Sequence, residues 1–238
     1  MGMTPAQVRC PLYAALRDPR TTLDEQEALA ADWLRTQSGS PLILASSIGD
    51  YRDSTLADQL PGAAVEKLGR RTAVGHSGPL LVAWPAAENL SQLQHLDQVT
   101  AICVVEGGGV LQQPWLRAQR AIDLATGIRL ETRSGLVPEV VAVAIQSLVP
   151  MLNGLSSSFD KPTVIDALCR LKASGYEVDP IAVYEFALRS GADGDEAILM
   201  HEVATGLRRG HSYRRSQRFG PDIIRHWEQE AAALPNRP

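Results

Sequence analysis

The spacing of apolar residues changes twice along the chain, and these changes predict three regions. In the first region, residues 4–18 and 22–37 carry apolar positions at helical spacing. The second of these stretches opens with Thr22-x-x-Glu25, a pattern typical of a capping box at a helix start. We therefore expect residues 1–40 to form an N-terminal helical segment.

In the second region, residues 41–132, apolar residues form short continuous runs that alternate with amphipathic stretches. The runs lie at 41–45, 79–84, 99–105 and 121–124, and the amphipathic stretches lie around 53–60, 88–96 and 113–120. Residues 70–74 are expected to add an edge strand. Continuous apolar strands alternating with helices are typical of a parallel sheet covered on both faces. The fold class predicted for this region is therefore α/β, a small Rossmann-like domain of three layers.

The third region, residues 133–238, shows no strand pattern. Residues 136–150 are almost wholly apolar and predict a central buried helix. Further helices are expected at 163–174, 180–190, 195–209 and 221–233. This region is therefore predicted to be a C-terminal domain made only of helices.

The composition is that of an ordinary globular protein. The 238 residues are 45% hydrophobic and 21% charged, which is enough to build a core without disulfides or metals. The three cysteines are far apart and form no CxxC pair, so neither a disulfide framework nor a zinc site is expected. No apolar run is long enough to cross a bilayer. These features predict a cytoplasmic protein without a metal, a cofactor or a membrane contact.

A glycine-rich loop, Glu106-Gly-Gly-Gly109, follows a predicted strand, where a phosphate-binding loop would lie. A dinucleotide fingerprint needs a third glycine at the position that Gln112 occupies here. A P-loop needs the dipeptide Gly-Lys, which does not occur in the chain. We therefore interpret the loop as a flexible turn between a strand and a helix.

A second candidate motif, Gly75-His-Ser-Gly-Pro79, is close to the nucleophile elbow of serine hydrolases. That elbow places its serine after a strand, whereas Ser77 precedes one, at the opposite end of the sheet. The five histidines show none of the spacings of a metal-binding motif. No catalytic residue and no metal ligand is assigned.

The order of strands and helices between residues 41 and 124 is similar to that of the second RecA-like half of helicases. In that family, a helix that carries arginine fingers has the pattern Q-x-x-G-R-x-x-R. The corresponding helix here contains Trp115-Leu-Arg-Ala-Gln-Arg120, which lacks both the glycine and the spacing. No half with a P-loop is present. The resemblance therefore concerns the order of elements alone and implies no helicase activity.

Ligands of parallel sheets bind beyond the carboxyl ends of the strands. Six residues at these ends are candidates for binding a small ligand, with or without a phosphate group: Ser46, Ser47, Asp50, Glu88, Glu106 and Gly108. A structural explanation competes with this one, because Asp50 and Glu88 begin helices, where a negative charge interacts well with the helix dipole.

A basic segment at residues 208–226 is the strongest local signal in the sequence. It carries a net charge of +5, and the rest of the chain therefore sums to −9. Its arginines are candidates for binding a nucleic-acid backbone or a protein partner: Arg208, Arg209, Arg214, Arg215, Arg218 and Arg225. Arginines interleaved with aromatic residues, here Tyr213 and Phe219, are typical of surfaces that bind phosphates and stack on bases. Alternatively, the segment neutralises acidic residues of the same chain or of a second copy in a homo-oligomer.

The sequence therefore favours a binding or adaptor protein without catalytic activity, which acts through contacts with another macromolecule. The alternative is an α/β enzyme or sensor that binds a small ligand at the strand ends.

Overall fold

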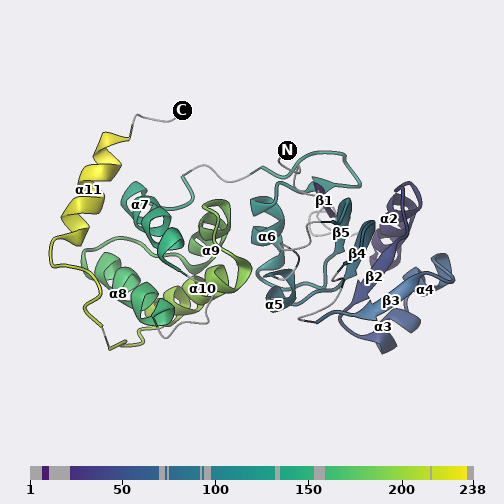
Figure 1. Cartoon of the computed structure of the whole chain (residues 1–238), viewed down its shortest axis with the longest axis horizontal. Coiled ribbons are helices and arrows are strands. Elements are labelled where there is room, and N and C mark those ends of the chain that lie inside the picture. Colours follow the sequence, from purple (N-terminus) through teal and green to yellow (C-terminus); the bar gives the residue numbers. More distant parts are fainter. Residues whose placement is uncertain are drawn as a thin grey trace. The chain divides into compact units, whose positions relative to one another are not determined.

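The computed structural model describes residues 7–10, 22–69, 73, 75–91, 93, 98–131, 135–152, 159–214 and 216–234. The chain divides into two compact units, residues 1–132 and 133–238. The first unit contains the sheet and the second consists of helices (Figure 1).

The sheet of the first unit has six strands, all paired in parallel, in the order β3-β2-β4-β5-β1-β6. The strands are β1 (Gln7–Cys10), β2 (Leu42–Ala45), β3 (Ala64–Lys67), β4 (Pro79–Ala83), β5 (Ala101–Val105) and β6 (Ile122–Asp123). Every residue of β2, β4 and β5 is buried. Burial on both faces explains why these strands are continuous apolar runs in the sequence.

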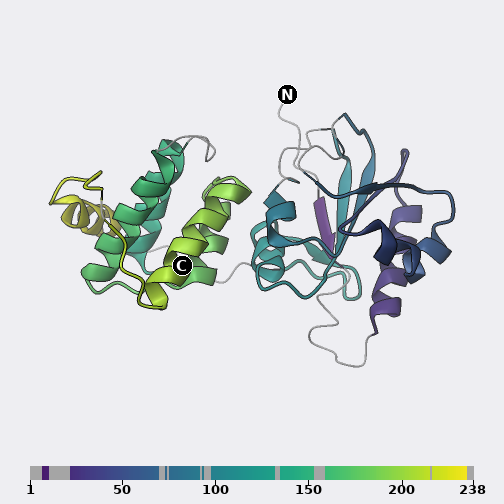
Figure 2. The ribbon, with the colours of Figure 1, turned by 90° about the horizontal axis from the view of Figure 1, so that it is seen from below.

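Helices lie on both sides of this sheet, which confirms the predicted α/β fold class (Figures 1 and 2). They are α2 (Leu23–Arg35), α3 (Ile48–Arg52), α4 (Thr55–Gln59), α5 (Ala87–Leu90) and α6 (Gln112–Ala118). The side of α2 that carries Ala30, Ala31 and Leu34 is buried, and α2 packs against β4 and β5. The long helix α2 therefore belongs to the same unit as the sheet.

The predicted start of α2 is confirmed in atomic detail. The Thr22 hydroxyl accepts a hydrogen bond from the backbone N–H of Glu25, and the Glu25 carboxylate accepts one from the N–H of Thr22. Two residues further on, the buried Glu27 accepts a hydrogen bond from the backbone N–H of Leu56 in α4, at 3.2 Å. Burial raises the pKa of the Glu27 carboxyl above its ordinary value, and this hydrogen bond lowers it in part.

One expectation for the first unit is wrong, and another falls almost wholly outside the described residues. Residues Gln7–Cys10, expected within a helix over 4–18, form strand β1, which pairs with β5 and β6. The described edge strand beside β2 is Ala64–Lys67, and the edge strand expected at 70–74 lies, except for Ala73, outside the described residues. In both cases a short strand is placed by pairing with strands distant in the sequence, and its own residues show no apolar run.

The helical unit contains α7 (Glu139–Leu148), a 3₁₀ turn η2 (Val149–Met151), α8 (Asp160–Ala173), α9 (Pro180–Arg189), α10 (Gly194–Arg208) and α11 (Ile223–Ala233). Helix α7 is buried as expected, with Val141, Ala144 and Leu148 fully inaccessible, and it packs against α8, α9 and α11. Helices α9 and α10 form the most extensive helix pair. Within the described part of the chain, no helix is both long and apolar enough to cross a membrane.

Helix α8 begins three residues earlier than the sequence indicated. Thr163, the first residue of the range predicted from the sequence, lies inside the helix, and its hydroxyl donates to the carbonyl oxygen of Phe159 at 2.7 Å. The start of α9 is as expected, because the Asp179 carboxylate accepts a hydrogen bond from the N–H of Ala182.

Candidate functional site

The two serine hydroxyls after β2 have local structural partners. The Ser46 hydroxyl donates to the carbonyl oxygen of Trp84, which follows β4, at 2.6 Å. The Ser47 hydroxyl accepts a hydrogen bond from the backbone N–H of Asp50 and so caps α3, while Asp50 lies exposed in the first turn of that helix. Both serines therefore have structural roles at this end of the sheet.

The glycine loop after β5 already has an oxygen bound to its backbone. The side-chain oxygen of Gln112 accepts hydrogen bonds from the N–H of Gly107 at 3.0 Å and from the N–H of Gly109 at 3.1 Å. The side-chain amide of Gln112 also donates to the carbonyl oxygen of Pro85. Backbone N–H groups of this kind bind phosphate oxygens in anion sites. Here the buried Gln112 takes that place, while the exposed Gly108 turns the chain with φ +82°.

Carboxylates make the same loop unfavourable for a phosphate. Glu106 is only 4% exposed, and both of its carboxylate oxygens accept hydrogen bonds from the side-chain amide of Gln113, at 2.9 and 2.7 Å. Glu88 is exposed in the first turn of α5. The structure therefore brings Ser46, Glu106 and the glycine loop to the ends of β2 and β5, on either side of β4, but it engages them in internal hydrogen bonds. No cluster of three or more metal-ligating side chains occurs among the described residues.

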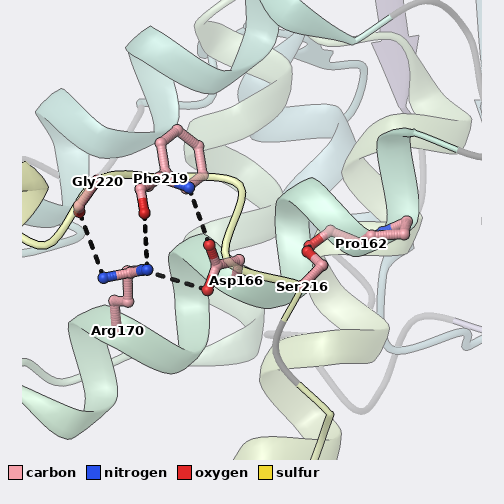
Figure 3. A network of polar contacts seen from close by, with 6 residues as sticks. All are labelled: Pro162, Asp166, Arg170, Ser216, Phe219 and Gly220. Atoms are coloured by element: carbon pink, nitrogen blue, oxygen red, sulfur yellow. Dashed lines mark hydrogen bonds and ion pairs between the residues drawn. The ribbon is translucent and has the colours of Figure 1, made fainter.

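The basic segment has a defined path over the helical unit. Residues 209–222, here called the strap, connect α10 to α11. Arg170 of α8 donates to the carbonyl oxygens of Phe219 at 2.8 Å and Gly220 at 3.4 Å. The buried Asp166 accepts from the N–H of Phe219 at 3.0 Å and pairs with Arg170 at 3.2 Å (Figure 3). The Asp166–Arg170 ion pair of α8 thus binds both an N–H group and carbonyl groups of the strap backbone.

Two further contacts anchor the strap before and after Arg214. The Ser216 hydroxyl donates to the carbonyl oxygen of Pro162 at 3.1 Å (Figure 3). On the other side, the ring of Tyr213 lies over Gly206 of α10, where a side chain would collide with it. Arg214, which lies between these two anchors, is exposed.

The predicted phosphate-binding arginines differ in how much of their charge is already engaged. Arg208 pairs with Asp179 at 3.2 Å, and Arg225 pairs with Asp222 at 3.6 Å. The guanidinium of Arg218 lies 4.5 Å from the centre of the Phe159 ring. Arg209 and Arg214 are exposed, and Arg215 lies outside the described residues.

A pocket of about 680 Å³ opens elsewhere in the helical unit, at the starts of α7 and α9. Three carboxylate residues are among those that line it, Glu177, Asp179 and the fully buried Glu185. Repulsion by these groups makes the pocket unsuitable for a phosphorylated ligand.

The residues that organise the strap were not found from the sequence. Asp166 and Arg170 are four residues apart, a spacing that indicates an ion pair along a helix. That spacing contains no information about the distant carbonyl groups of Phe219 and Gly220. Gln112 was likewise considered only because it occupies the position where a dinucleotide fingerprint has its third glycine, and its own hydrogen bonds were not predicted.

Residues 137–228 match a family model described as Domain of unknown function (DUF1889). The match spans the helical unit from α7 into α11 and includes the strap with its arginines. No curated protein and no solved structure matches the chain.

Proposed function

We propose that this protein is a binding protein without catalytic activity, whose strap contacts the phosphate backbone of a nucleic acid. One observation carries the proposal: Ser46, Glu106 and the glycine loop at the strand ends are bound internally, whereas arginines of the strap face solvent on an anchored segment. The side chains of Arg209, Arg214 and Arg218 are all exposed.

The contrast between the two candidate sites supports this choice. A ligand at the glycine loop would have to displace the Gln112 side chain, which bonds to Gly107, Gly109 and Pro85. A phosphate at the strap displaces only water from exposed guanidinium groups. Guanidinium and phosphate also match in geometry, because the planar fork of arginine donates two parallel hydrogen bonds.

The charge distribution gives a second argument. The net charge of residues 208–226 is +5, in a chain whose total net charge is −4. A local concentration of one charge attracts a polyanion even when the whole protein is acidic. Anchoring by Asp166 and Arg170 lowers the entropy that the strap would lose on binding.

The proposal is tested by a titration of nucleic acid with the triple variant Arg209→Ala/Arg214→Ala/Arg218→Ala. A control with three exposed arginines outside the strap is Arg52→Ala/Arg129→Ala/Arg189→Ala, which changes the net charge equally. We expect the strap variant to bind weakly and to lose about two to three units of salt slope, close to one per lost contact. The control should retain the slope of the wild type.

Equal losses of affinity and salt slope in both variants would show that net charge alone drives binding. The strap would then not be the binding surface. If the wild type binds no nucleic acid at about 50 mM salt, where screening is weak, the proposed function is wrong. A change in oligomeric state of the strap variant would then identify an acidic protein surface as the partner.

A further inference from the structure

We infer that the strap recognises only the chain of phosphates of a nucleic acid and makes no contact with its nucleobases. This inference rests on the proposed function and deepens it. Proteins that bind single strands stack successive bases on exposed aromatic rings, and the sequence places Tyr213 and Phe219 among the arginines. What decides the matter is whether those rings are accessible.

The aromatic rings of Tyr213, Phe219 and Phe159 are half-buried, and each of them contacts another side chain of the protein. Phe219 meets Trp227 edge-on, with ring centres 5.6 Å apart, and Trp227 is 1% exposed. Tyr213 packs over Gly206 and meets His211 edge-on at 6.4 Å. A face of the Phe159 ring is covered by the Arg218 guanidinium. Each ring therefore already uses an edge or a face in a contact with the protein, which makes it a poorer platform for base stacking than a fully exposed ring.

The arginines, by contrast, keep their hydrogen-bond donors. The guanidinium carbon of Arg218 lies over the Phe159 ring, and a cation–π contact of this kind does not use up the N–H donors of the group. Arg209 and Arg214 are exposed on the same connecting segment. These groups recognise phosphate oxygens, which are the same in every sequence and in a polymer without bases.

The neighbouring helix α10 does not supply base contacts either. Its first turn carries Asp195 and Glu196, and Glu196 forms a capping box with Asp193. Three carboxylates at the end that would enter a groove repel a nucleic acid. The strap is therefore a basic surface suited to a polyanion. The two polymers that fit it, a nucleic-acid backbone and inorganic polyphosphate, share a chain of phosphate groups.

The full-length protein is tested by fluorescence anisotropy with three labelled probes of equal length: a single strand, the same strand without bases, and a duplex. Unlabelled inorganic polyphosphate serves as competitor. We expect the strand without bases to bind within about threefold of the normal strand, since lost stacking on even one ring would cost about tenfold. We also expect Arg214→Ala to weaken all three complexes by the same factor.

Each outcome distinguishes the inference from the function on which it rests. A loss of about tenfold or more without bases would overturn the inference and leave nucleic-acid binding intact. Binding of no probe and no polyphosphate would overturn both. Displacement of all three probes by polyphosphate supports the inference, and binding of polyphosphate alone supports it while identifying that polymer, and not a nucleic acid, as the ligand.

Discussion

At the scale of the residue, Gly206 shows how the absence of a side chain positions the strap. A Cβ atom there would lie 2.9 Å from Cζ of Tyr213 and would overlap its hydroxyl oxygen. It would also lie 3.1 Å from Nδ1 of His211, whose backbone N–H donates to the carbonyl oxygen of Gly206. Glycine normally weakens a helix interior, so its presence in α10 is explained by this contact.

Gly206→Ala should therefore have opposite effects in two backgrounds. In the wild type it displaces the Tyr213 ring, and we expect a loss of about 1 to 2 kcal/mol of unfolding free energy. In a Tyr213→Ala background the collision is absent, and the better helix propensity of alanine should add up to about 1 kcal/mol. Urea unfolding of the four proteins measures both effects. The same sign in both backgrounds would mean that Tyr213 does not rest on Gly206.

At the scale of the element, the strap depends on one ion pair of α8. The Asp166 carboxylate is buried, while the Arg170 side chain is 17% exposed. Arg170 also holds the carbonyl oxygens of Phe219 and Gly220. Without the guanidinium, the buried carboxylate would have only the N–H of Phe219 as its described partner from the strap.

We expect Arg170→Met to lower the free energy of unfolding by about 2 to 4 kcal/mol, because it leaves a buried charge without its counter-ion. The strap should also open locally, so that trypsin cleaves after Arg214 or Arg218 faster than in the wild type. Arg189→Met, a change of an exposed arginine on α9, is the control and should alter neither quantity. An unchanged cleavage rate in Arg170→Met would show that α8 does not anchor the strap.

Elements with a strong apolar pattern were predictable, and elements placed by distant partners were not. The buried strands β2, β4 and β5 and the helices α2, α7 and α9 were expected close to their observed ranges. Strand β1 was missed because its position depends on pairing with Ala101 and Ile122. The same holds for the site: the basic segment was visible in the sequence, but its attachment to Asp166 and the internal use of its aromatic rings are tertiary contacts.

At the scale of the whole molecule, the helical unit has its own core. Residues such as Ile145, Leu168, Tyr184 and Trp227 are buried within it, and the family model matches this unit alone. A core of this kind is the usual condition for independent folding.

Residues 133–238 expressed alone should therefore melt in one cooperative transition and retain the salt-dependent binding proposed for the strap. A shorter fragment, 152–238, lacks α7 and its buried residues, and it should not melt cooperatively. Circular dichroism and the same titration measure both properties. A non-cooperative 133–238 fragment would show that the helices depend on the rest of the chain.

The position of β1 also bears on the order in which the first unit can assemble during synthesis. The ribosome releases β1 before its partners, yet in the sheet it lies between β5 and β6, the last two strands of this unit to be made. The strands β2, β3, β4 and β5 can pair as soon as they emerge, whereas β1 must wait for β5, with which it pairs from Gln7–Ala101 to Arg9–Cys103, and β6 adds afterwards at the other side of β1. Closing so long a loop has an entropic cost and slows the step. Insertion of β1 is therefore a late event on the nascent chain, and until then the edge of β5 stays open to other strands.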